Sequence, residues 1–303
     1  MTINKEGQTF FSLRAMRSPR LSLEKISHGL NAMTQLDKER IVGASPTGAA
    51  GPDSAARAVQ EMFTSIAPRY DLLNHLLSFN IDRLWWWRAA RRFDRILKRD
   101  GVRVLDLCCG TGDMAFALWR RPRARNAKIL GADFSHAMLQ LAAAKSTSTA
   151  PQKGSDPSSG AETGHAPSLH WVEADALRLP FPDAHFDLVT SAFGFRNLAD
   201  YDAGLREIVR VLRPGGECGI LDFGEPRGLI GQVYRVYFKK ILPKVGTLIS
   251  GVRGPYAYLP ASVERFPPPE EMMARMKQAG FAEASWTPYT FGIAGLYWGV
   301  KSG

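Results

Sequence analysis

The stretch VLDLCCGTGD, residues 104–113, places two cysteines, two glycines and two carboxylates close together. A metal or redox site needs sulfurs that converge on one point. Cys108 and Cys109 do not meet this requirement, because neighbouring side chains of a strand point to opposite faces, and Cys218 is far along the chain. We therefore predict three free cysteines that are buried or line a loop, and no metal site.

The glycines of the same stretch predict a nucleoside site. Gly110 and Gly112 follow an apolar run with the spacing G-x-G-x-x-A, which ends at Ala115. Between a strand and a helix, such glycines let the backbone approach a ligand. Asp133 ends the second predicted strand, where its carboxylate can accept hydrogen bonds from both ribose hydroxyls of NAD or of S-adenosylmethionine.

The charge of the residues around the glycine turn distinguishes between NAD and S-adenosylmethionine. Asp106 and Asp113 flank the glycine turn, where they would repel a pyrophosphate and attract the sulfonium and amino groups of S-adenosylmethionine. A unit charge at about 4 Å is worth about 4 kcal/mol at an effective dielectric of about 20. The acids therefore favour S-adenosylmethionine, with the alternative that Asp113 only caps the following helix.

Further polar residues follow the third and fourth predicted strands. Asp175 lies in VEADALRLPF, where it can accept the adenine amino group, or alternatively cap a turn. Arg196 and Asn197 come after the fourth strand. In parallel sheets, ligands bind beyond the carboxyl ends of the strands, so these residues are expected at one edge with the glycine loop.

Helical and strand patterns alternate along the chain. In the best-supported helix, Leu205, Ile208, Val209 and Leu212 recur with helical spacing. The predicted helices cover 55–67, 71–79, 82–98, 112–121, 135–145, 200–212 and 268–279. The predicted strands cover 102–108, 128–134, 169–174, 186–193 and 217–223, with a closing hairpin over 281–301. This order predicts an α/β fold, a mostly parallel sheet with helices on both faces.

Composition predicts one catalytic domain. The 303 residues are 45% hydrophobic and 22% charged, which suffices for a substantial core. The composition of residues 1–52 indicates a disordered extension, and that of residues 146–168 indicates a low-complexity surface insertion. The domain is therefore expected over 53–303, with N-terminal cover helices over 55–98. The sequence shows neither a long apolar run nor a signal-peptide pattern, and we expect a cytoplasmic protein.

The net charge of +10 raises nucleic acid and anionic membrane surfaces as partners. Residues 230–242 carry a broad apolar face that could cover a tunnel or lie on a membrane. Three consecutive tryptophans, residues 85–87, cannot all face the core, so at least one should reach a tunnel, an interface or the headgroup region.

Several of these stretches resemble the quinone-ring C-methyltransferases that make menaquinone and ubiquinone, over about residues 57–301. The shared stretches are VLDLCCGTGD, GADFSHAML, ADALRLPFPDAHFD, AFGFRNLADYDAGLREIVRVLRPGGE, YAYLPASVERFP and SIAPRYDLLNHLLSFNIDRLWW. YDLLNHLLS, FGFRN and YAYLPASVERFP are more restricted to this family than the glycine motif. The resemblance implies a seven-stranded, Rossmann-like methyltransferase fold, S-adenosylmethionine as donor and a prenylated quinol as substrate.

The resemblance also implies donor contacts. They are Thr111 in the glycine loop, Asp133 at the ribose, and Asp175 with Ala176 at the adenine. A fourth contact, often a serine just before FG, falls on Ala192 here. The complete predicted donor site consists of Asp106, Gly110, Thr111, Gly112, Asp113, Asp133, Asp175, Ala176 and Ala192.

Methylation of a ring carbon requires an electron-rich ring, so we expect a hydroquinol that ionises to a phenolate. A phenol with a pKa of about 10 is mostly neutral at pH 7, and a cation or a base must help. Arg196 is the predicted phenolate stabiliser and Asn197 an orienting group, with an ion pair between Arg196 and Asp200 or Asp202 as the alternative.

The YDLLN stretch supplies the predicted base. Asp71 is the favoured carboxylate, with Tyr70 and Asn74 beside it, and helix capping and packing are the alternative roles. Two other readings of the whole chain stay open, an NAD-binding oxidoreductase and a basic RNA methyltransferase relative. The expected partners are the prenylated quinol, naphthoquinol or benzoquinol, and the inner face of a membrane, but not nucleic acid. A homodimer is compatible with these features.

Overall fold

The computed structural model describes residues 43–44, 46, 51–67, 78, 80–124, 126–149, 168–226, 228, 231, 237 and 255–303. All of them belong to one compact unit, Ile41–Gly303. The predicted helix over 71–79 and the apolar face over 230–242 lie almost entirely outside the described residues, as do residues 150–167 of the predicted insertion.

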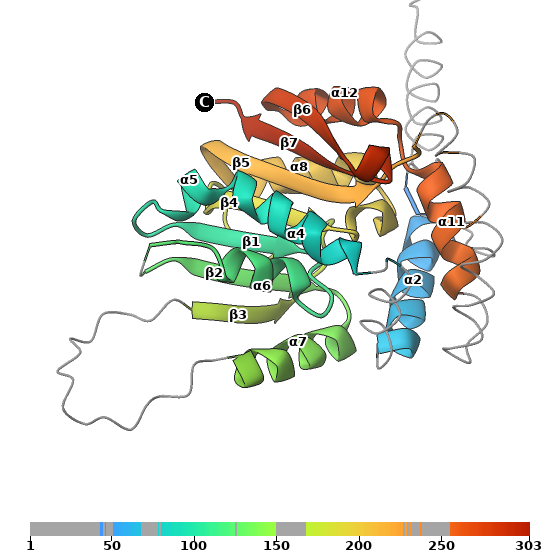
Figure 1. The fold of residues 1–303 in the computed structure, drawn as a ribbon, viewed down its shortest axis with the longest axis horizontal. Coiled ribbons are helices and arrows are strands. Elements are labelled where there is room, and N and C mark those ends of the chain that lie inside the picture. Colours follow the sequence, from blue (N-terminus) through green and yellow to red (C-terminus); the bar gives the residue numbers. More distant parts are fainter. Residues whose placement is uncertain are drawn as a thin grey trace, which may run out of the picture. The chain divides into compact units, whose positions relative to one another are not determined.

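A seven-stranded sheet forms the centre of this unit, in the order β3-β2-β1-β4-β5-β7-β6 (Figure 1). The strands are β1 Arg103–Leu107, β2 Lys128–Asp133, β3 Ser168–Glu173, β4 Phe186–Ala192, β5 Leu212–Phe223, β6 Phe281–Tyr289 and β7 Ala294–Lys301. The first five pair in parallel, whereas β7 runs antiparallel to β5 and β6. The predicted mostly parallel sheet and its closing hairpin are confirmed.

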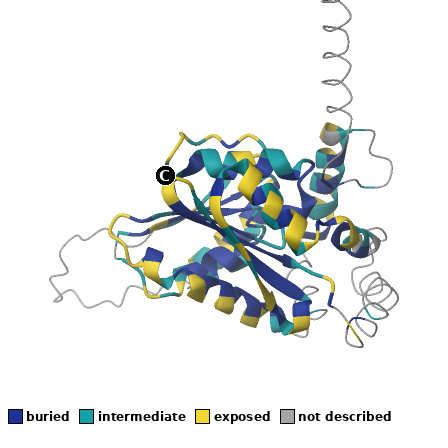
Figure 2. Cartoon of the chain, turned by 90° about the horizontal axis from the view of Figure 1, so that it is seen from above, coloured by how far each residue is buried: buried dark blue, intermediate teal, exposed yellow. Residues whose placement is uncertain are grey.

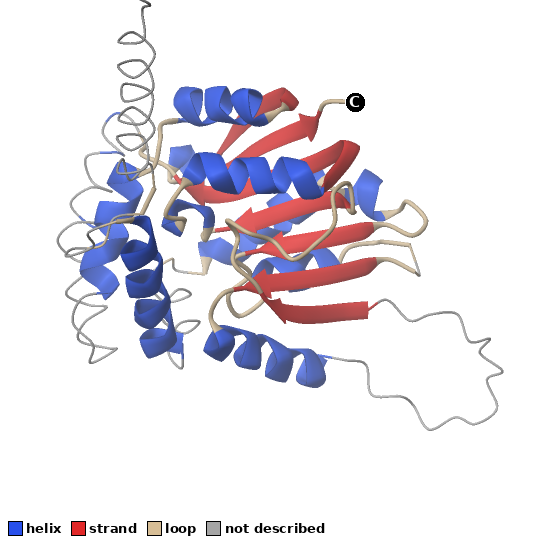
Figure 3. Cartoon of the chain, turned by 180° about the vertical axis from the view of Figure 1, so that it is seen from behind, coloured by secondary structure: helices blue, strands red, loops and turns tan. Residues whose placement is uncertain are grey.

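Helices cover both faces of the sheet. They are α2 Pro52–Ile66, α4 Ile81–Arg92, α5 Asp94–Leu97, α6 Asp113–Trp119, α7 His136–Thr149, α8 Tyr201–Val211, α11 Pro255–Arg265 and α12 Pro269–Ala279, with the short 3₁₀ helices η2 Phe195–Asn197 and η4 Thr290–Gly292. Helices α4, α5 and α6 pack on one face (Figure 1), and α8 and α12 on the other (Figure 3). Buried residues accordingly concentrate along the strands and on the inward sides of the helices (Figure 2).

Two predictions of helices need correction. The helix expected over 82–98 is divided at Phe93, which has a non-helical ψ of 9° and lies 1% exposed in the core. Its ring fills the space that Gly219 leaves on β5, where an added Cβ would lie 2.4 Å from the ring. Helix α11 was not predicted, because Pro260 inside it is a helix-breaking signal.

The segment before α2 also contacts the domain. Ala44 is 1% exposed, and its N–H donates a hydrogen bond to the Leu198 carbonyl at 2.7 Å. Leu198 directly follows Arg196 and Asn197. The predicted extension over 1–52 thus includes residues that pack against the loop carrying this pair.

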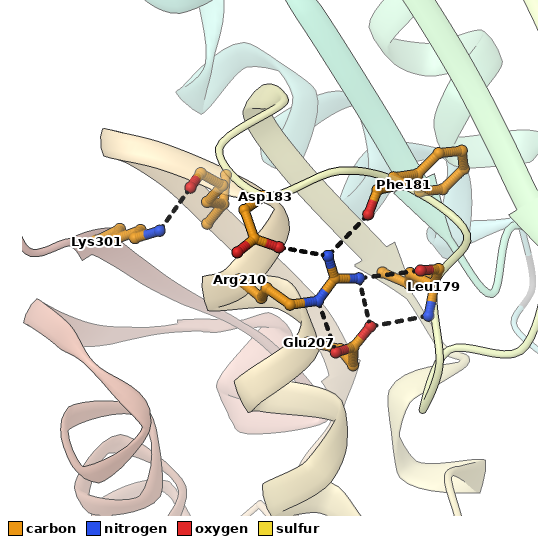
Figure 4. A network of polar contacts seen from close by, with 7 residues as sticks. Leu179, Phe181, Asp183, Glu207, Arg210 and Lys301 are labelled. Atoms are coloured by element: carbon orange, nitrogen blue, oxygen red, sulfur yellow. Dashed lines mark hydrogen bonds and ion pairs between the residues drawn. The ribbon is translucent and has the colours of Figure 1, made fainter.

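Arg210 of α8 holds the loop between β3 and β4 (Figure 4). Its guanidinium donates to the carbonyls of Leu179 and Phe181 at 2.9 and 2.7 Å. It also donates to the carboxylates of Asp183 and Glu207, each at 2.8 Å. Several charge-assisted hydrogen bonds to one rigid fork fix a loop firmly. The same loop carries the predicted adenine contacts.

Candidate active site

A cavity of about 320 Å³ lies at the carboxyl ends of the parallel strands. The predicted residues in its wall are Asp106, Gly110, Thr111, Asp113, Asp133, Asp175, Ala176, Ala192, Arg196 and Asn197. Gly112 is not among the lining residues. Tyr70, Asp71 and Asn74 lie outside the described residues.

Asp133 organises the glycine loop. Its carboxylate accepts hydrogen bonds from the Gly110 N–H at 2.8 Å and the Ser135 N–H at 2.9 Å. Burial raises the pKa of Asp133 to about 6, although both hydrogen bonds oppose the shift. The carboxylate therefore shapes the loop as well as facing the cavity.

Gly112 has a structural role in the turn before α6. Its φ of 89° is in the left-handed region, and it is the N-cap of α6. A Cβ on Gly112 would lie 2.4 Å from the Trp171 ring. Only glycine combines this backbone conformation with such a close approach.

Asp106 is a fully buried carboxylate at the end of β1. One oxygen accepts a hydrogen bond from the Thr190 hydroxyl at 2.8 Å, and the other has no hydrogen-bond partner among the described residues. Burial raises the pKa of Asp106 to about 7, and the nearby charges of Asp133 and Asp113 raise it further. An orphaned buried oxygen of this kind is a position where a bound cation is stabilised.

Lys145 is a residue that the sequence analysis missed. Its ammonium group, at the far end of α7, donates to the Thr111 hydroxyl at 2.9 Å and to the Asp113 carboxylate at 3.1 Å. Asp113 is thus paired with a cation, which offsets much of its negative charge. Nothing in the local sequence around Lys145 indicates this contact.

The residues after β3 form a turn cap and part of the cavity wall. Asp175 is exposed, and its carboxylate accepts a hydrogen bond from the Leu177 N–H at 2.9 Å, which is the turn cap of the alternative reading. Both Asp175 and Ala176 also line the cavity. Ala192 lines it too, whereas Ser191 does not, since strand alternation turns its side chain to the other face.

Helix α2 covers the end of the cavity near Asp133. Gln60 donates to the Phe134 carbonyl at 2.6 Å, and the hydroxyls of Thr64 and Ser135 lie 3.2 Å apart. At the start of the helix, the Ser54 hydroxyl accepts a hydrogen bond from the Gly51 N–H at 3.0 Å and donates one to the Gly51 carbonyl at 2.8 Å. Two hydrogen bonds thus hold α2 over the end of β2, next to Asp133.

Arg196 lies on η2, 5% exposed, and pairs with Asp222 at the end of β5. Its Nη1 donates to Asp222 Oδ1 at 2.9 Å, and its backbone N–H donates to Oδ2 at 3.2 Å. Burial raises the pKa of Asp222, and the charge of Arg196 opposes this shift. Asp222 was missed, although it follows an apolar strand at the ligand edge as Asp106 and Asp133 do.

The predicted alternative, an ion pair of Arg196 with Asp200 or Asp202, is wrong, because Arg196 pairs with Asp222. Asp200 instead caps α8 by accepting the Ala203 N–H at 2.8 Å. Asp202 instead pairs with Arg275 at 2.8 Å. An ion pair exists at Arg196, but β5 supplies its carboxylate.

Two polar atoms of the FRN turn are buried without a hydrogen-bond partner among the described residues, namely Arg196 Nε and Asn197 Oδ1. Both residues line the cavity. The Arg196 guanidinium is otherwise engaged, over the Phe223 ring at 5.1 Å and at the Phe193 carbonyl. Each unsatisfied buried group costs about 1–3 kcal/mol, so a polar ligand that engages them is favoured.

The remainder of the wall is largely apolar. Trp85 and Trp86 are buried and line the cavity, whereas Trp87 is exposed. The prediction that the three tryptophans cannot all face the core is confirmed, because Trp87 is exposed. Tyr258 of α11, also missed, lines the same cavity, and its buried hydroxyl has no hydrogen-bond partner among the described residues.

The comparison with known families decides the class of this site. Residues 52–301 match the model of the ubiE/COQ5 methyltransferase family. The chain belongs to this family. It is an S-adenosylmethionine-dependent methyltransferase, and neither an NAD oxidoreductase nor a nucleic-acid methyltransferase relative is favoured.

Individual relatives agree with this assignment. The methyltransferase is 48% identical over 246 residues to the demethylmenaquinone methyltransferase of Deinococcus radiodurans, covering 81% of this chain and 93% of the relative. It is 42% identical over 244 residues to the ubiquinone/menaquinone biosynthesis C-methyltransferase UbiE of Geobacter sulfurreducens, covering 80% and 88%. A SAM dependent methyltransferase from Aquifex aeolicus, 17% identical, aligns over 72% of this chain and 92% of its own with a TM-score of 0.50, which shows the shared fold.

The end of the cavity that is lined by Asp106, Asp113 and Asp133 suits a cation. Cys108 and Cys109 are free, as predicted, and burial raises the pKa of both thiols, so they stay neutral. The charge at this end therefore comes from carboxylates. Among the described residues, no group of three or more His, Cys, Asp or Glu side chains could hold a metal ion.

The raised pKa values predict proton-coupled binding of S-adenosylmethionine. In the free enzyme, Asp106 and Asp133 take up protons below about pH 7 and pH 6, respectively. A cation binds the ionised forms, so binding must release these protons at lower pH. We expect the affinity to rise by up to about tenfold per pH unit for each proton released between pH 5 and 7, and to level off above. Calorimetry in buffers of different ionisation enthalpy measures the number of protons released on binding. An affinity that does not change between pH 5 and pH 8 would contradict the expectation.

Proposed function

We propose that this methyltransferase transfers the methyl group of S-adenosylmethionine to a ring carbon of a prenylated hydroquinol, with demethylmenaquinol as the preferred acceptor. The main support for this function is that one cavity combines buried acids, the FRN turn and an aromatic wall. The preference for a naphthoquinol is supported by the relative from D. radiodurans, which is named demethylmenaquinone methyltransferase and is 48% identical.

The donor would bind along the ends of β1, β2 and β3. In this arrangement Asp133 holds the ribose, and Asp175 with Ala176 meets the adenine. Asp106 and the loop at Gly110 and Thr111 face the methionine part, and Ala192 closes the far side. Gly112 and Asp113 shape the loop and contact the donor less directly. The support is that all of these except Gly112 line one cavity.

The acceptor would bind at the FRN turn. Arg196 Nε is a donor suited to a phenolate oxygen, and Asn197 Oδ1 is an acceptor suited to a hydroxyl. Because Asp222 neutralises much of the guanidinium charge, Arg196 acts chiefly as a fixed hydrogen-bond donor. It is a poor base, so the base remains proposed at Asp71, with Tyr70 and Asn74 near it.

Electrostatics and proximity would drive the reaction. Bound S-adenosylmethionine supplies an electrophilic methyl group on a sulfonium. Arg196 stabilises the negative charge on the ring oxygen while the ring carbon forms its bond to the methyl group and the carbon–sulfur bond breaks. The base then receives the proton that the methylated carbon loses. The tryptophans and α2 exclude water and hold the ring in line with the methyl group.

A mass assay tests the proposed function. The full chain is incubated with S-adenosylmethionine and short-tailed demethylated naphthoquinol or benzoquinol, each reduced and each oxidised. We expect a gain of one methyl group on the reduced rings, a higher kcat/KM for the naphthoquinol, and no product from oxidised rings. Absence of a methylated product from both quinols would overturn the function, and a higher kcat/KM for the benzoquinol would overturn the preferred acceptor.

Such a substrate lies in a bilayer, so the proposal includes peripheral contact with the inner face of a membrane. No helix in the described part of the chain is long and apolar enough to cross a membrane. A homodimer stays a prediction from the sequence.

A further inference from the structure

Three large apolar side chains of the described residues are exposed, and they lie on two neighbouring elements. Leu84 and Trp87 are on α4, 50% and 44% exposed, and Phe291 is on η4, 75% exposed. The two elements touch, because Trp85 Nε1 donates to the Thr290 hydroxyl at 2.7 Å. We name this region the α4–η4 surface, which comprises Arg83, Leu84, Trp87, Arg88, Arg91 and Phe291.

The α4–η4 surface borders the cavity. Ile81, Trp85 and Trp86 of α4 line the cavity, and Thr290 of η4 does so too. These residues alternate with the exposed ones along the same two elements. The exposed apolar side chains therefore lie on the same two elements that form part of the cavity wall.

The same surface is strongly basic. Arg83, Arg88 and Arg91 are all exposed on α4. The two acids nearby balance them only in part, because Asp94 is already paired with Arg121 at 2.7 Å and Asp82 is a single buried carboxylate beside three arginines. The surface thus has an excess of positive charge.

The arginines are also placed beside aromatic rings. The Arg91 guanidinium lies 5.3 Å from the centre of the Trp87 ring, and Arg88 lies 4.2 Å from the centre of the Tyr289 ring. A tryptophan flanked by guanidinium groups is suited to the headgroup level of a bilayer.

Phe291 gives independent support. Its φ of 59° is in the left-handed region, which a bulky side chain rarely adopts. Glycine or asparagine would fit this turn better, and the ring is too exposed to stabilise the core. The phenylalanine is thus unfavourable for the turn and adds little to the core.

We propose that the α4–η4 surface docks on an anionic lipid bilayer and presents the cavity to the prenylated acceptor in that bilayer. Arginines pair with lipid phosphates, while Leu84, Trp87 and Phe291 enter the boundary between headgroups and acyl chains. The exposed Leu84 beside the two aromatic rings favours lipid over nucleic acid, because bases stack on aromatic rings and phosphates pair with arginines, whereas an aliphatic side chain offers neither interaction. The docking itself rests on exposure and charge, and only the delivery of the acceptor rests on the proposed function.

Vesicle sedimentation of the full chain tests the docking. We expect binding to phosphatidylcholine vesicles that contain phosphatidylglycerol, and little binding to phosphatidylcholine alone. Arg83→Glu/Arg91→Glu should lower the partition coefficient by about tenfold or more. The matched control is Arg206→Glu/Lys277→Glu on α8 and α12, two exposed basic residues outside the cavity wall, and it should lower binding by about twofold or less, through net charge alone.

Phe291→Gly separates docking from folding. It removes strain, so the melting temperature should stay equal or rise, whereas vesicle binding should fall several-fold. Wild-type binding by the Arg83→Glu/Arg91→Glu and Phe291→Gly variants would overturn the proposal. Equal losses in the control variant would do so too, as would arginine-dependent binding to RNA with vesicle binding unchanged.

Turnover distinguishes the docking from the proposed function. With a short-tailed soluble quinol, the docking variants should react as the wild type does, and with a long-tailed quinol in anionic vesicles they should be slower. Vesicle binding without turnover of any quinol would refute the proposed function but not the docking of the α4–η4 surface. Turnover of soluble quinol without vesicle binding would refute the docking but not the proposed function.

Discussion

Arg196→Ala is expected to cut kcat by about a hundredfold or more and to leave the affinity for S-adenosylmethionine unchanged, because the lost interaction belongs to the transition state. Raising the pH should restore part of the rate, since an alkaline solution supplies the ionised quinol that the arginine no longer favours. Arg196→Lys should keep part of the activity, because an ammonium group still donates hydrogen bonds, although the planar fork that fixes their direction is lost.

The buried pair with Asp222 complicates this experiment, and a second variant resolves it. Removing Arg196 alone leaves an uncompensated buried carboxylate, which destabilises the fold by about 3–5 kcal/mol. Arg196→Leu/Asp222→Asn removes both charges and should recover much of the stability but not the rate. Normal turnover of either variant, or a failure explained by lost cofactor binding, would make Arg196 a structural residue.

Asp133→Ala is expected to weaken S-adenosylmethionine binding by about 1.5–3 kcal/mol through the loss of charge-assisted hydrogen bonds to the ribose. The same carboxylate accepts hydrogen bonds from Gly110 and Ser135, so part of the loss will come from a looser glycine loop. Calorimetry gives the affinity, and the melting temperature reports on the loop.

The exposed Asp175 provides a comparison for Asp133. Asp175→Ala should weaken donor binding less, because water competes for an exposed carboxylate. An unchanged affinity of the Asp133→Ala protein, with its fold intact, would remove Asp133 from the donor site. If Asp175→Ala weakened donor binding more than Asp133→Ala does, Asp175 would be the more important of the two carboxylates for donor binding.

The sequence by itself determined the class of the fold and the position of most candidate site residues. Apolar runs followed by Asp106, Asp133 and Asp175 mark strand ends, and parallel strands bring their carboxyl ends to one edge of the sheet. The place of these residues therefore follows from local patterns and one topological rule. The motifs that resemble the family supplied the substrate class, which spacing alone does not contain.

Only the tertiary structure decided which side chains contact one another across that edge of the sheet. Arg196 meets Asp222 because β4 and β5 are neighbours in a register that pairs Ala192 with Leu221. Lys145 reaches the glycine loop because its helix packs beside β2 and β3, although the loop follows β1. Partners separated by many residues depend on strand order, register and helix packing together, and the periodicity of a local segment carries no information about them.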